Sequence, residues 1–294
     1  MDLKMANIET LVEDIHKLLE GRSVFDLPEK LADQFAERMK NLVINRVGRG
    51  SEHTPALRIS NIGKPCVRQT WLAIHNPEET EPLRAEARMK FLYGDVIEEL
   101  LLFLAEAAGH TVELVQQQVE VEGVKGHWDA VIDGMVVDAK SASSYSFKKF
   151  LEGNLVNDDP FGYVGQIQTY LEAAQDIPEV TIKDRCAFLV MDKTLGHICL
   201  DIHKRVEFDV KAITRNKKDI INSLDIPNRA FEPVPEGKSG NMKLGMQCSY
   251  CNMKYACWPK LRTFIYSSGP VYLTEVYKEP SVPEVQREEI FKDV

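Results

Sequence analysis

Three side chains of the types that could hydrolyse a phosphodiester bond lie in one short stretch: Asp129, Asp138 and Lys140. Hard divalent cations prefer oxygen ligands, so paired carboxylates predict a site for such an ion. A bound cation can polarise a phosphoryl oxygen and activate water, and a nearby ammonium group stabilises the charge that develops. The alternative is that both aspartates lie on the solvent side of an ordinary hairpin.

The surrounding sequence predicts a β-hairpin that would bring these residues together. Val131-Ile132 and Met135-Val136-Val137 are β-forming runs, and Asp133-Gly134 between them is a strong signal for a two-residue turn. That turn fixes the expected register: Ile132 faces Met135, Val131 faces Val136, Ala130 faces Val137, Asp129 faces Asp138, and His127 faces Lys140. Opposed residues lie about 4.5–5.5 Å apart at Cβ, where like charges repel unless a cation lies between them.

Two helices are expected to flank the hairpin and add polar groups to it. A long helix from about Arg84 to Ala108 carries Glu98 on its apolar side, where a carboxylate is rare unless it is paired or bound to metal. A second helix, from Phe161 to Ala174, places Gln166 and Tyr170 four residues apart on one face. A salt-bridged glutamate and ordinary surface contacts are the alternatives.

A second group of candidate ligands consists of cysteines. Cys248, Cys251 and Cys257 lie in a compact segment with little apolar character, and Cys66, in a Lys-Pro-Cys turn, is the best fourth ligand. Four thiolates select soft metals, which means Zn²⁺ or an iron–sulfur cluster. The alternative is four free cysteines. Cys186 and Cys199 lie in strand-like apolar runs and are expected in the core.

Composition and charge restrict the class of protein. The chain has 294 residues, 44% hydrophobic and 28% charged residues and a net charge of −9, which argues against coating nucleic acid by charge alone. Residues 36–70 nevertheless hold seven basic and two acidic residues, a candidate phosphate-contact surface or a solvated face. The basic residues are Arg38, Lys40, Arg46, Arg49, Arg58, Lys64 and Arg68. No apolar run is long enough to span a membrane and the N-terminus lacks a signal core, so we expect a cytosolic protein.

The order of elements predicts a mixed α/β (α+β) fold with a central mixed sheet flanked by helices. The expected parts are an N-terminal helical cap (1–57), the first cluster cysteine with a linker (58–84) and the core (85–226). A linker with the cysteine cluster (227–265) and an extended tail (266–294) follow. Strands are expected at 111–121, 181–191 and 197–203, and a basic helix at 206–224.

With these motifs in order, the chain resembles the RecB-type branch of the PD-(D/E)XK nucleases over about Arg58–Leu261. Gly126-His-Trp-Asp129 matches its Gly-x-x-Asp motif, Asp138-Ala-Lys140 its (Asp/Glu)-x-Lys, and Gln166 to Tyr170 its Gln-x-x-x-Tyr. The one-plus-three cysteines are similar to those of the branch that holds a [4Fe-4S] cluster, which includes the AddB nuclease domain and the CRISPR-adaptation exonuclease. The family often has Gly-x-x-x-His where this chain has Gly94-x-x-x-Glu98.

The resemblance implies a stand-alone phage or prokaryotic DNA exonuclease that acts on ends or single strands in recombination, repair or replication. Asp129, Asp138, Glu98 and the Ala139 carbonyl would hold one or two Mg²⁺ or Mn²⁺ ions, and Lys140 would position water. Gln166 and Tyr170 would orient the lysine or the DNA. Candidate DNA contacts are Arg68, His127, Lys148 and Lys149. A structure-specific or restriction-like endonuclease and a nuclease-like DNA-binding subunit of a larger complex are the alternative functions, and structural Zn²⁺ is the alternative to the cluster. A recombination or replication protein is a candidate partner.

Overall fold

The computed structural model describes residues 7–23, 27–48 and 55–287, which separate into two compact units. The first unit contains residues 1–53, 58–64 and 89–216, and the second contains 54–57, 65–88 and 217–294. The helices are α1 (Leu11–Leu19), α2 (Glu29–Val43), α3 (Ile59–Ile62), α4 (Val67–His75), α5 (Ala85–Ala107), α6 (Ser144–Leu151), α7 (Tyr163–Ala173), α8 (Val210–Asn222), α9 (Met246–Ser249) and α10 (Lys254–Cys257). Short 3₁₀ turns lie at Ile8–Thr10, Pro77–Glu79, Leu155–Asn157 and Ala174–Asp176, and a π-helical turn at Ile44–Gly48.

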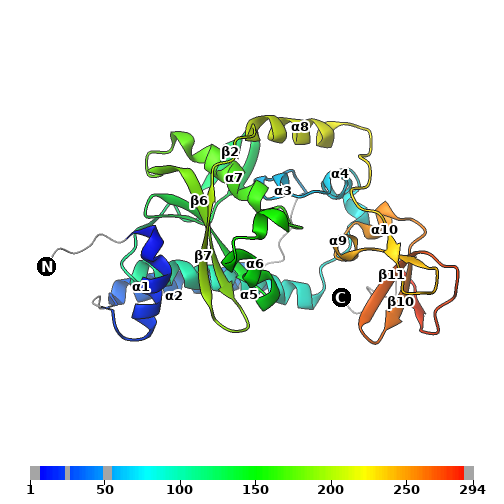
Figure 1. Cartoon of the computed structure of the whole chain (residues 1–294), viewed down its shortest axis with the longest axis horizontal. Coiled ribbons are helices and arrows are strands. Elements are labelled where there is room, and N and C mark those ends of the chain that lie inside the picture. The colour runs from blue at the N-terminus through cyan, green and yellow to red at the C-terminus, as the bar shows by residue number, and fades with distance from the viewer. Residues whose placement is uncertain (1–6, 24–26, 49–54, 288–294) are drawn as a thin grey trace. The chain divides into compact units, whose positions relative to one another are not determined.

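A five-stranded mixed sheet forms the centre of the first unit (Figure 1). Its order is β1 (Val112–Glu113), β4 (Ala130–Ile132), β5 (Met135–Ala142), β6 (Ile182–Asp192) and β7 (Ile198–Lys204). Only β5 and β6 are parallel; the other pairs are antiparallel. The expected mixed α/β fold with a central mixed sheet is therefore confirmed. A separate ribbon joins β2 (Gln118–Val121) to β3 (Val124–His127).

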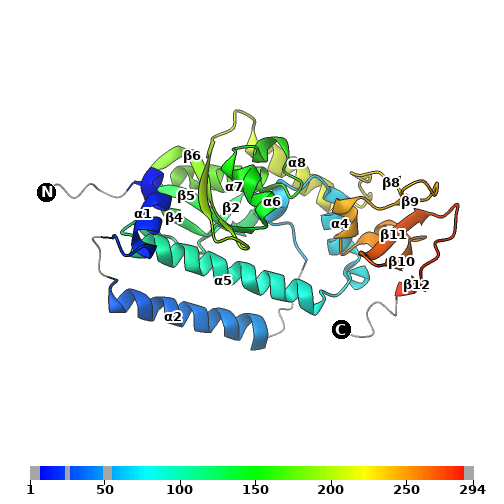
Figure 2. The same cartoon turned by 60° about the horizontal axis from the view of Figure 1, so that its bottom comes forward.

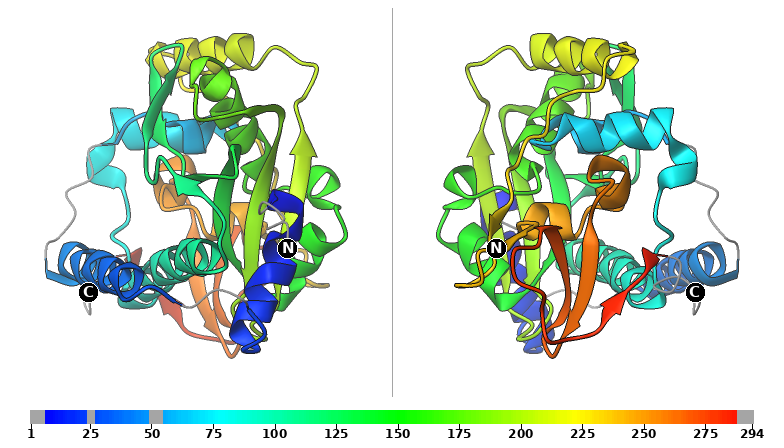
Figure 3. Two further views of the ribbon diagram at one scale, coloured as in Figure 1. Left: turned by 90° about the vertical axis from the view of Figure 1, so that its left-hand side faces the viewer. Right: turned by 90° about the vertical axis from the view of Figure 1, so that its right-hand side faces the viewer.

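Helices cover both faces of this sheet, as its edge-on view in Figure 3 shows for α5 and α6. Alternate residues of the central strands, among them Val137, Ala139 and Leu189, join one apolar cluster with buried residues of α1 and α5. Because strand side chains alternate, Asp138 and Phe188 project from the opposite face. There the Phe188 ring packs edge-on against that of Phe150 in α6, with centroids 5.5 Å apart.

The N-terminal helices differ from the cap that was expected. Ile8, Leu11 and Ile15 are at most 1% exposed within the main apolar cluster, so α1 belongs to the core. Helix α2 runs beside α5 (Figure 2), where the rings of Phe35 and Phe103 stack with centroids 4.4 Å apart. Leu31 of α2 is buried, whereas Val43 at its end is 45% exposed. The cap interpretation was wrong for α1, because Leu11 and Ile15 of this helix and Ile8 of the turn before it pack in the core.

The second unit has its own five-stranded sheet, which the sequence did not predict. Its order is β12 (Glu284–Val285), β10 (Arg262–Tyr266), β11 (Gly269–Glu275), β9 (Met242–Lys243) and β8 (Val234–Pro235). The expected extended tail from residue 266 is therefore wrong as far as β12, and the expected linker contains β8 and β9. The physical reason is burial: Phe264 and Leu273 are 1% and 0% exposed. Residues 288–294 of the predicted tail lie outside the described residues.

Candidate active site

The predicted two-residue turn sets the register of the hairpin. Asp133 and Gly134 have φ values of 47° and 79°, as a turn of this kind requires. The pairs Ala130–Val137, Val131–Val136 and Ile132–Met135 form as predicted. The Asp133 carboxylate also accepts hydrogen bonds from the backbone N–H of Thr111 at 3.0 Å and contacts Nδ1 of His110 at 2.6 Å. These contacts fix the turn and with it the position of Asp138.

The sheet opens where the candidate site lies. Strand β5 pairs with β4 only as far as Val137, whereas its pairing with β6 continues to Ala142. Residues 138–142 therefore have an edge that β4 does not cover. Asp129 occupies part of this edge, because its Oδ2 accepts a hydrogen bond from the Ala139 N–H at 2.7 Å. The N–H and C=O of one strand residue point to the same side, so the Ala139 carbonyl faces this edge as well.

Three carboxylates meet at this open edge. Asp138 is 1% and Asp129 9% exposed, and α5 contributes Glu98. Burial raises the pKa of Asp129 well above its usual value, and the charges of Asp138 and Glu98 raise it further. Burial also raises the pKa of Glu98 to about 7, with Asp138 adding to the shift. This mutual repulsion is what a divalent cation would relieve.

Lys140 lies at the same edge and forms an ion pair with Asp138. Its Nζ lies 5.2 Å from the centroid of the Tyr163 ring. Burial lowers the pKa of Lys140, but the Asp138 and Asp129 carboxylates outweigh burial and raise it above its usual value. The lysine is therefore protonated at neutral pH and can donate hydrogen bonds, but it cannot serve as a base.

Helix α7 brings the two remaining candidates to Asp138. The Gln166 side chain donates from Nε2 to Asp138 Oδ1 at 3.3 Å and to the Tyr170 hydroxyl at 3.4 Å. Tyr170 is 2% exposed, and burial raises its pKa to about 12. The tyrosine therefore remains neutral and holds Gln166, which in turn contacts the aspartate.

Three glycines hold α7 close to α3. A Cβ on Gly63 would lie 1.8 Å from the carbonyl oxygen of Gly162, and one on Gly165 would lie 2.5 Å from Cα of Gly63. The Asp159 carboxylate then accepts the backbone N–H groups of residues 162–164 at 2.8–3.0 Å. The helix that carries Gln166 and Tyr170 is thus fixed at its beginning.

One residue of the site was missed by sequence reasoning. Gln116 donates from Nε2 to Glu98, and the same Nε2 lies 3.4 Å from Asp129 Oδ1. The residue belongs to the polar run Gln116-Gln117-Gln118, between β1 and β2, and nothing in that run distinguishes it. Its role depends on φ of 53°, which turns the chain back toward Asp129.

The prediction that His127 faces Lys140 is wrong. His127 instead pairs with Gln118 in the β2–β3 ribbon. A continuous strand was expected from His127 into β4, but it is interrupted at Trp128. This residue is fully buried and donates from Nε1 to the Leu114 carbonyl at 2.9 Å. That contact redirects the chain, so Asp129 reaches the site from a bend and not from a ladder position.

The other candidate DNA contacts are placed as follows. Arg68 belongs to the second unit, where its Nε contacts Cys257 Sγ at 3.2 Å and its Nη1 the Pro227 carbonyl at 2.6 Å. Lys148 is exposed and pairs with Glu152 at 3.6 Å, whereas Lys149 pairs with Asp158 at 2.6 Å. In the basic stretch, Arg38 pairs with Glu99 at 3.0 Å and Arg46 pairs with Asp95. Arg49 lies outside the described residues.

Whether these donors fit a metal ion depends on their spacing and on their charge. In the described parts of the chain, no three histidine, cysteine, aspartate or glutamate side chains are close enough to form a ready metal site. The carboxylates nevertheless fit a hard cation by chemistry, since Asp129, Asp138 and Glu98 interact repulsively in a buried place. The Lys140 ammonium group is the positive charge that pairs with Asp138 in this structure.

The four predicted cluster cysteines all belong to the second unit. Burial raises the pKa of Cys251 to about 12, and the neighbouring thiols Cys66, Cys248 and Cys257 raise it as well, so the four lie near one another. Hydrogen-bond donors also point at the sulfurs: the backbone N–H of Met253 reaches Cys251 Sγ at 3.4 Å. None of the four forms a disulfide, and thiols as a class suit a soft metal, although within the described residues they are not spaced as a ready metal site. Cys186 and Cys199 are buried, as predicted.

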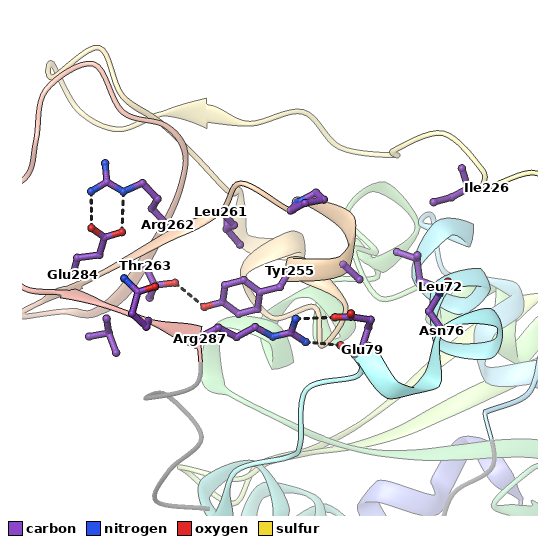
Figure 4. A pocket seen from close by; sticks show the side chains of 14 residues that line it. Leu72, Asn76, Glu79, Ile226, Tyr255, Leu261, Arg262, Thr263, Glu284 and Arg287 are labelled. Atoms are coloured by element: carbon purple, nitrogen blue, oxygen red, sulfur yellow. Dashed lines mark hydrogen bonds and ion pairs between the residues drawn. The ribbon is translucent and has the colours of Figure 1, made fainter.

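A large cavity lies elsewhere, in the second unit, with a volume of about 590 Å³ (Figure 4). Its walls include Tyr255 and two ion pairs, Arg262 with Glu284 and Arg287 with Glu79. None of the candidate catalytic residues or cluster cysteines lines it. Both of its guanidinium groups are paired with carboxylates.

Comparison with known proteins gives little further information. No protein-family model and no curated protein sequence matches the chain. Its structure is similar to a solved one described as "Crystal structure of SSO0001", with a TM-score of 0.40 and 14% sequence identity over 76% of this chain and 94% of that one. A TM-score this low does not define a shared fold. Among the described helices, none has the length and apolar character that crossing a membrane requires.

Proposed function

We propose that the chain is a metal-dependent DNA exonuclease with a PD-(D/E)XK nuclease core. The observation that carries the proposal is the convergence of five side chains on the open edge of β5. These are Asp129, Asp138, Glu98, Lys140 and Gln166, which come from a strand, two helices and a bend far apart in sequence. If the two aspartates lay on the solvent side of an ordinary hairpin they would be exposed, whereas both are buried.

Each residue has a role that its geometry supports. The carboxylates of Asp129, Asp138 and Glu98, with the Ala139 carbonyl, would hold Mg²⁺ or Mn²⁺, which would supply Lewis acidity and a water of lowered pKa. Lys140 is protonated, so it would donate to a phosphoryl oxygen and stabilise its developing negative charge. Gln166 would keep Asp138 in place, and Tyr170 would hold Gln166. Water would add to phosphorus, and the P–O bond to the leaving sugar oxygen would break.

The cysteines support a second part of the proposal. Cys66, Cys248, Cys251 and Cys257 would bind a [4Fe-4S] cluster, with Zn²⁺ as the alternative. The second unit consists of chain segments that precede and follow the core in sequence, and a metal centre would join them. Its role would be structural.

The test is degradation of DNA by the purified protein in Mg²⁺. We expect an end-labelled linear duplex or single strand to be degraded while a covalently closed circle survives. Lys140→Ala should abolish cleavage and leave the circular dichroism spectrum unchanged, while the melting temperature in chelator should fall because the carboxylates lose their counter-charge. Cleavage of the closed circle would favour the endonuclease alternative. Equal activity of Lys140→Ala and the unmodified protein would refute the site, and DNA binding without cleavage would favour a binding subunit.

A further inference from the structure

A cavity of about 190 Å³ lies beside Lys140, between α6 and the loop that leads into α7. We call it the α6 cavity. Its floor is apolar and contains Phe150 and Leu155, which are 4% and 3% exposed. Its rim is polar and carries Lys140, Lys149, Lys193 and the hydroxyl groups of Ser143 and Ser146. An apolar floor beneath an ammonium and hydroxyl rim suits a ligand with a flat base and an anionic group.

The lysines of the rim are of two kinds. Lys149 is held in place, because its Nζ pairs with Asp158 Oδ2 at 2.6 Å and its side chain is only 16% exposed. Lys193 lies on the β6–β7 connection and makes no ion pair with any residue that the structure describes. The second acid on the wall, Asp159, accepts three backbone N–H groups at the start of α7, which satisfy its oxygens as acceptors but leave its negative charge. A phosphate would therefore meet one preplaced and one available ammonium group.

An aromatic side chain stands at the entrance of the cavity. The Phe161 ring is 52% exposed although it lines the cavity, and its centroid lies 5.5 Å from that of the half-buried Tyr163. Tyr163 is the same ring that lies beneath the Lys140 ammonium. Exposed aromatic rings beside basic groups provide a surface on which a nucleobase stacks with little regard to sequence.

Size restricts what the α6 cavity can hold. Typical pockets for drug-sized ligands measure about 300–1,000 Å³, so a cavity of about 190 Å³ admits part of one nucleotide and not a passing strand. The buried Phe150 and Leu155 are part of its lining. A single nucleotide at a strand end therefore suits this volume better than a continuous strand.

We propose that the α6 cavity binds the terminal nucleotide of a DNA strand, with its phosphate at Lys149 and Lys193 and its base against Phe161. This inference rests on the proposed nuclease function and deepens it: a one-nucleotide subsite next to Lys140 would make cleavage depend on a strand end. The ligand class is a deoxynucleoside monophosphate, either as the end of the strand or as the released product.

Binding of deoxyadenosine 5′-monophosphate, measured by saturation-transfer NMR on the metal-free full chain, tests the cavity independently of cleavage. We expect Lys193→Ala and Lys149→Ala each to weaken binding by about tenfold or more. Lys125→Ala is the control, since Lys125 is an exposed lysine of the first unit that does not line the cavity, and this variant should bind as the unmodified chain does. Equal weakening in all three variants would indicate general charge loss and overturn the proposal. Lys193 is exposed, so its variant remains informative if Lys149→Ala misfolds.

Two competitors separate a nucleotide site from a simple anion site. Deoxyadenosine, without phosphate, should displace the nucleotide weakly, and inorganic phosphate should do so less well than the nucleotide itself. Phosphate that competes as well as the nucleotide would overturn the role of Phe161. Phe161→Ala should abolish the advantage of the nucleotide over phosphate.

Activity distinguishes failure of the inference from failure of the proposed function. If the unmodified chain degrades linear DNA but Lys149→Ala and Lys193→Ala retain its rate and KM for ends, the nuclease stands and the terminal subsite is refuted. If the chain cleaves no DNA yet binds the nucleotide through these lysines, the subsite is supported and the nuclease is refuted. An increased KM for DNA ends in both lysine variants supports the nuclease function and the terminal subsite together.

Discussion

The Asp129 carboxylate accepts the Ala139 backbone N–H at 2.7 Å, two residues beyond Val137, the last residue of β5 that pairs with β4. The Asp129 side chain thus supplies a hydrogen-bond acceptor to β5 beyond the point where β4 ends. One carboxylate oxygen satisfies the sheet edge, while the other lies 3.4 Å from the Gln116 amide nitrogen. The residue therefore has a structural task and a candidate ligand task at once, and a substitution can separate them.

Asp129→Asn should separate stability from activity. The asparagine carbonyl can still accept the Ala139 N–H. Removing the buried charge of Asp129 also removes its repulsion with Asp138 and Glu98 when no metal is bound. We expect a higher melting temperature than that of the unmodified chain in chelator, measured by calorimetry. Cleavage in Mg²⁺ should fall by about 100-fold or more, because a ligand and a charge are both lost. A lower melting temperature in chelator would contradict the repulsion.

Glu98 predicts a pH dependence of stability in the absence of metal. Its folded pKa of about 7 lies above the usual value of 4.5, so the folded state favours the protonated form. The associated stability is fully present below the usual pKa and is lost as the pH rises through about 7. Glu98→Gln lacks this loss, and Gln116 can still donate to its amide oxygen.

We therefore expect Glu98→Gln to melt above the unmodified chain at pH 8 and close to it at pH 4.5. The difference should be about 2–4 °C for each kcal/mol of relieved repulsion. Mg²⁺ should raise the melting temperature of the unmodified chain at pH 8 more than that of the variant. If the difference in melting temperature between Glu98→Gln and the unmodified chain is the same at pH 4.5 and pH 8, titration of Glu98 is excluded as its source.

The contact between α3 and α7 predicts opposite effects for two alanine substitutions. Gly63→Ala places a methyl group against the Gly162 carbonyl, so α7 must move. We expect a loss of about 1–3 kcal/mol or more in unfolding free energy and a weaker site, since Gln166 moves with α7. Gly94→Ala is the control, because its Cβ meets only Ser141 Oγ at 3.6 Å and it lies within α5. That variant should gain about 0.5–1 kcal/mol.

The cysteines predict a coloured protein. Anaerobically purified protein should be brown and contain iron and sulfide, and Cys66→Ser or Cys257→Ser should lose both together with stability of the second unit. Cys199→Ala is the control, because that thiol is buried in β7 of the first unit. A colourless protein with stoichiometric zinc would overturn the cluster and leave the four-thiolate site. A metal-free protein of equal stability would overturn both.

Local rules predicted the hairpin but not its surroundings. Asp133-Gly134 determines the register because both residues must adopt positive φ, a property of the turn alone. The break at Trp128 depends on a hydrogen bond to Leu114, and the contact of Gln116 with Glu98 depends on how two loops fold. The second sheet was missed because prolines and charges obscure strands that Phe264 and Leu273 stabilise by burial. Side chains that act through distant partners carry no local signal.

The discontinuous second unit has a consequence for biosynthesis. Cys66 leaves the ribosome about 180 residues before Cys248, which corresponds to on the order of 10–40 s at typical bacterial and eukaryotic elongation rates. During that interval its thiol has no cysteine partners from the later segment, and the core can fold first. If these thiols bind the proposed iron–sulfur cluster, assembly of that centre would be the last event of maturation. Cells starved of iron should then accumulate chains with a folded core and an immature, protease-sensitive C-terminal region.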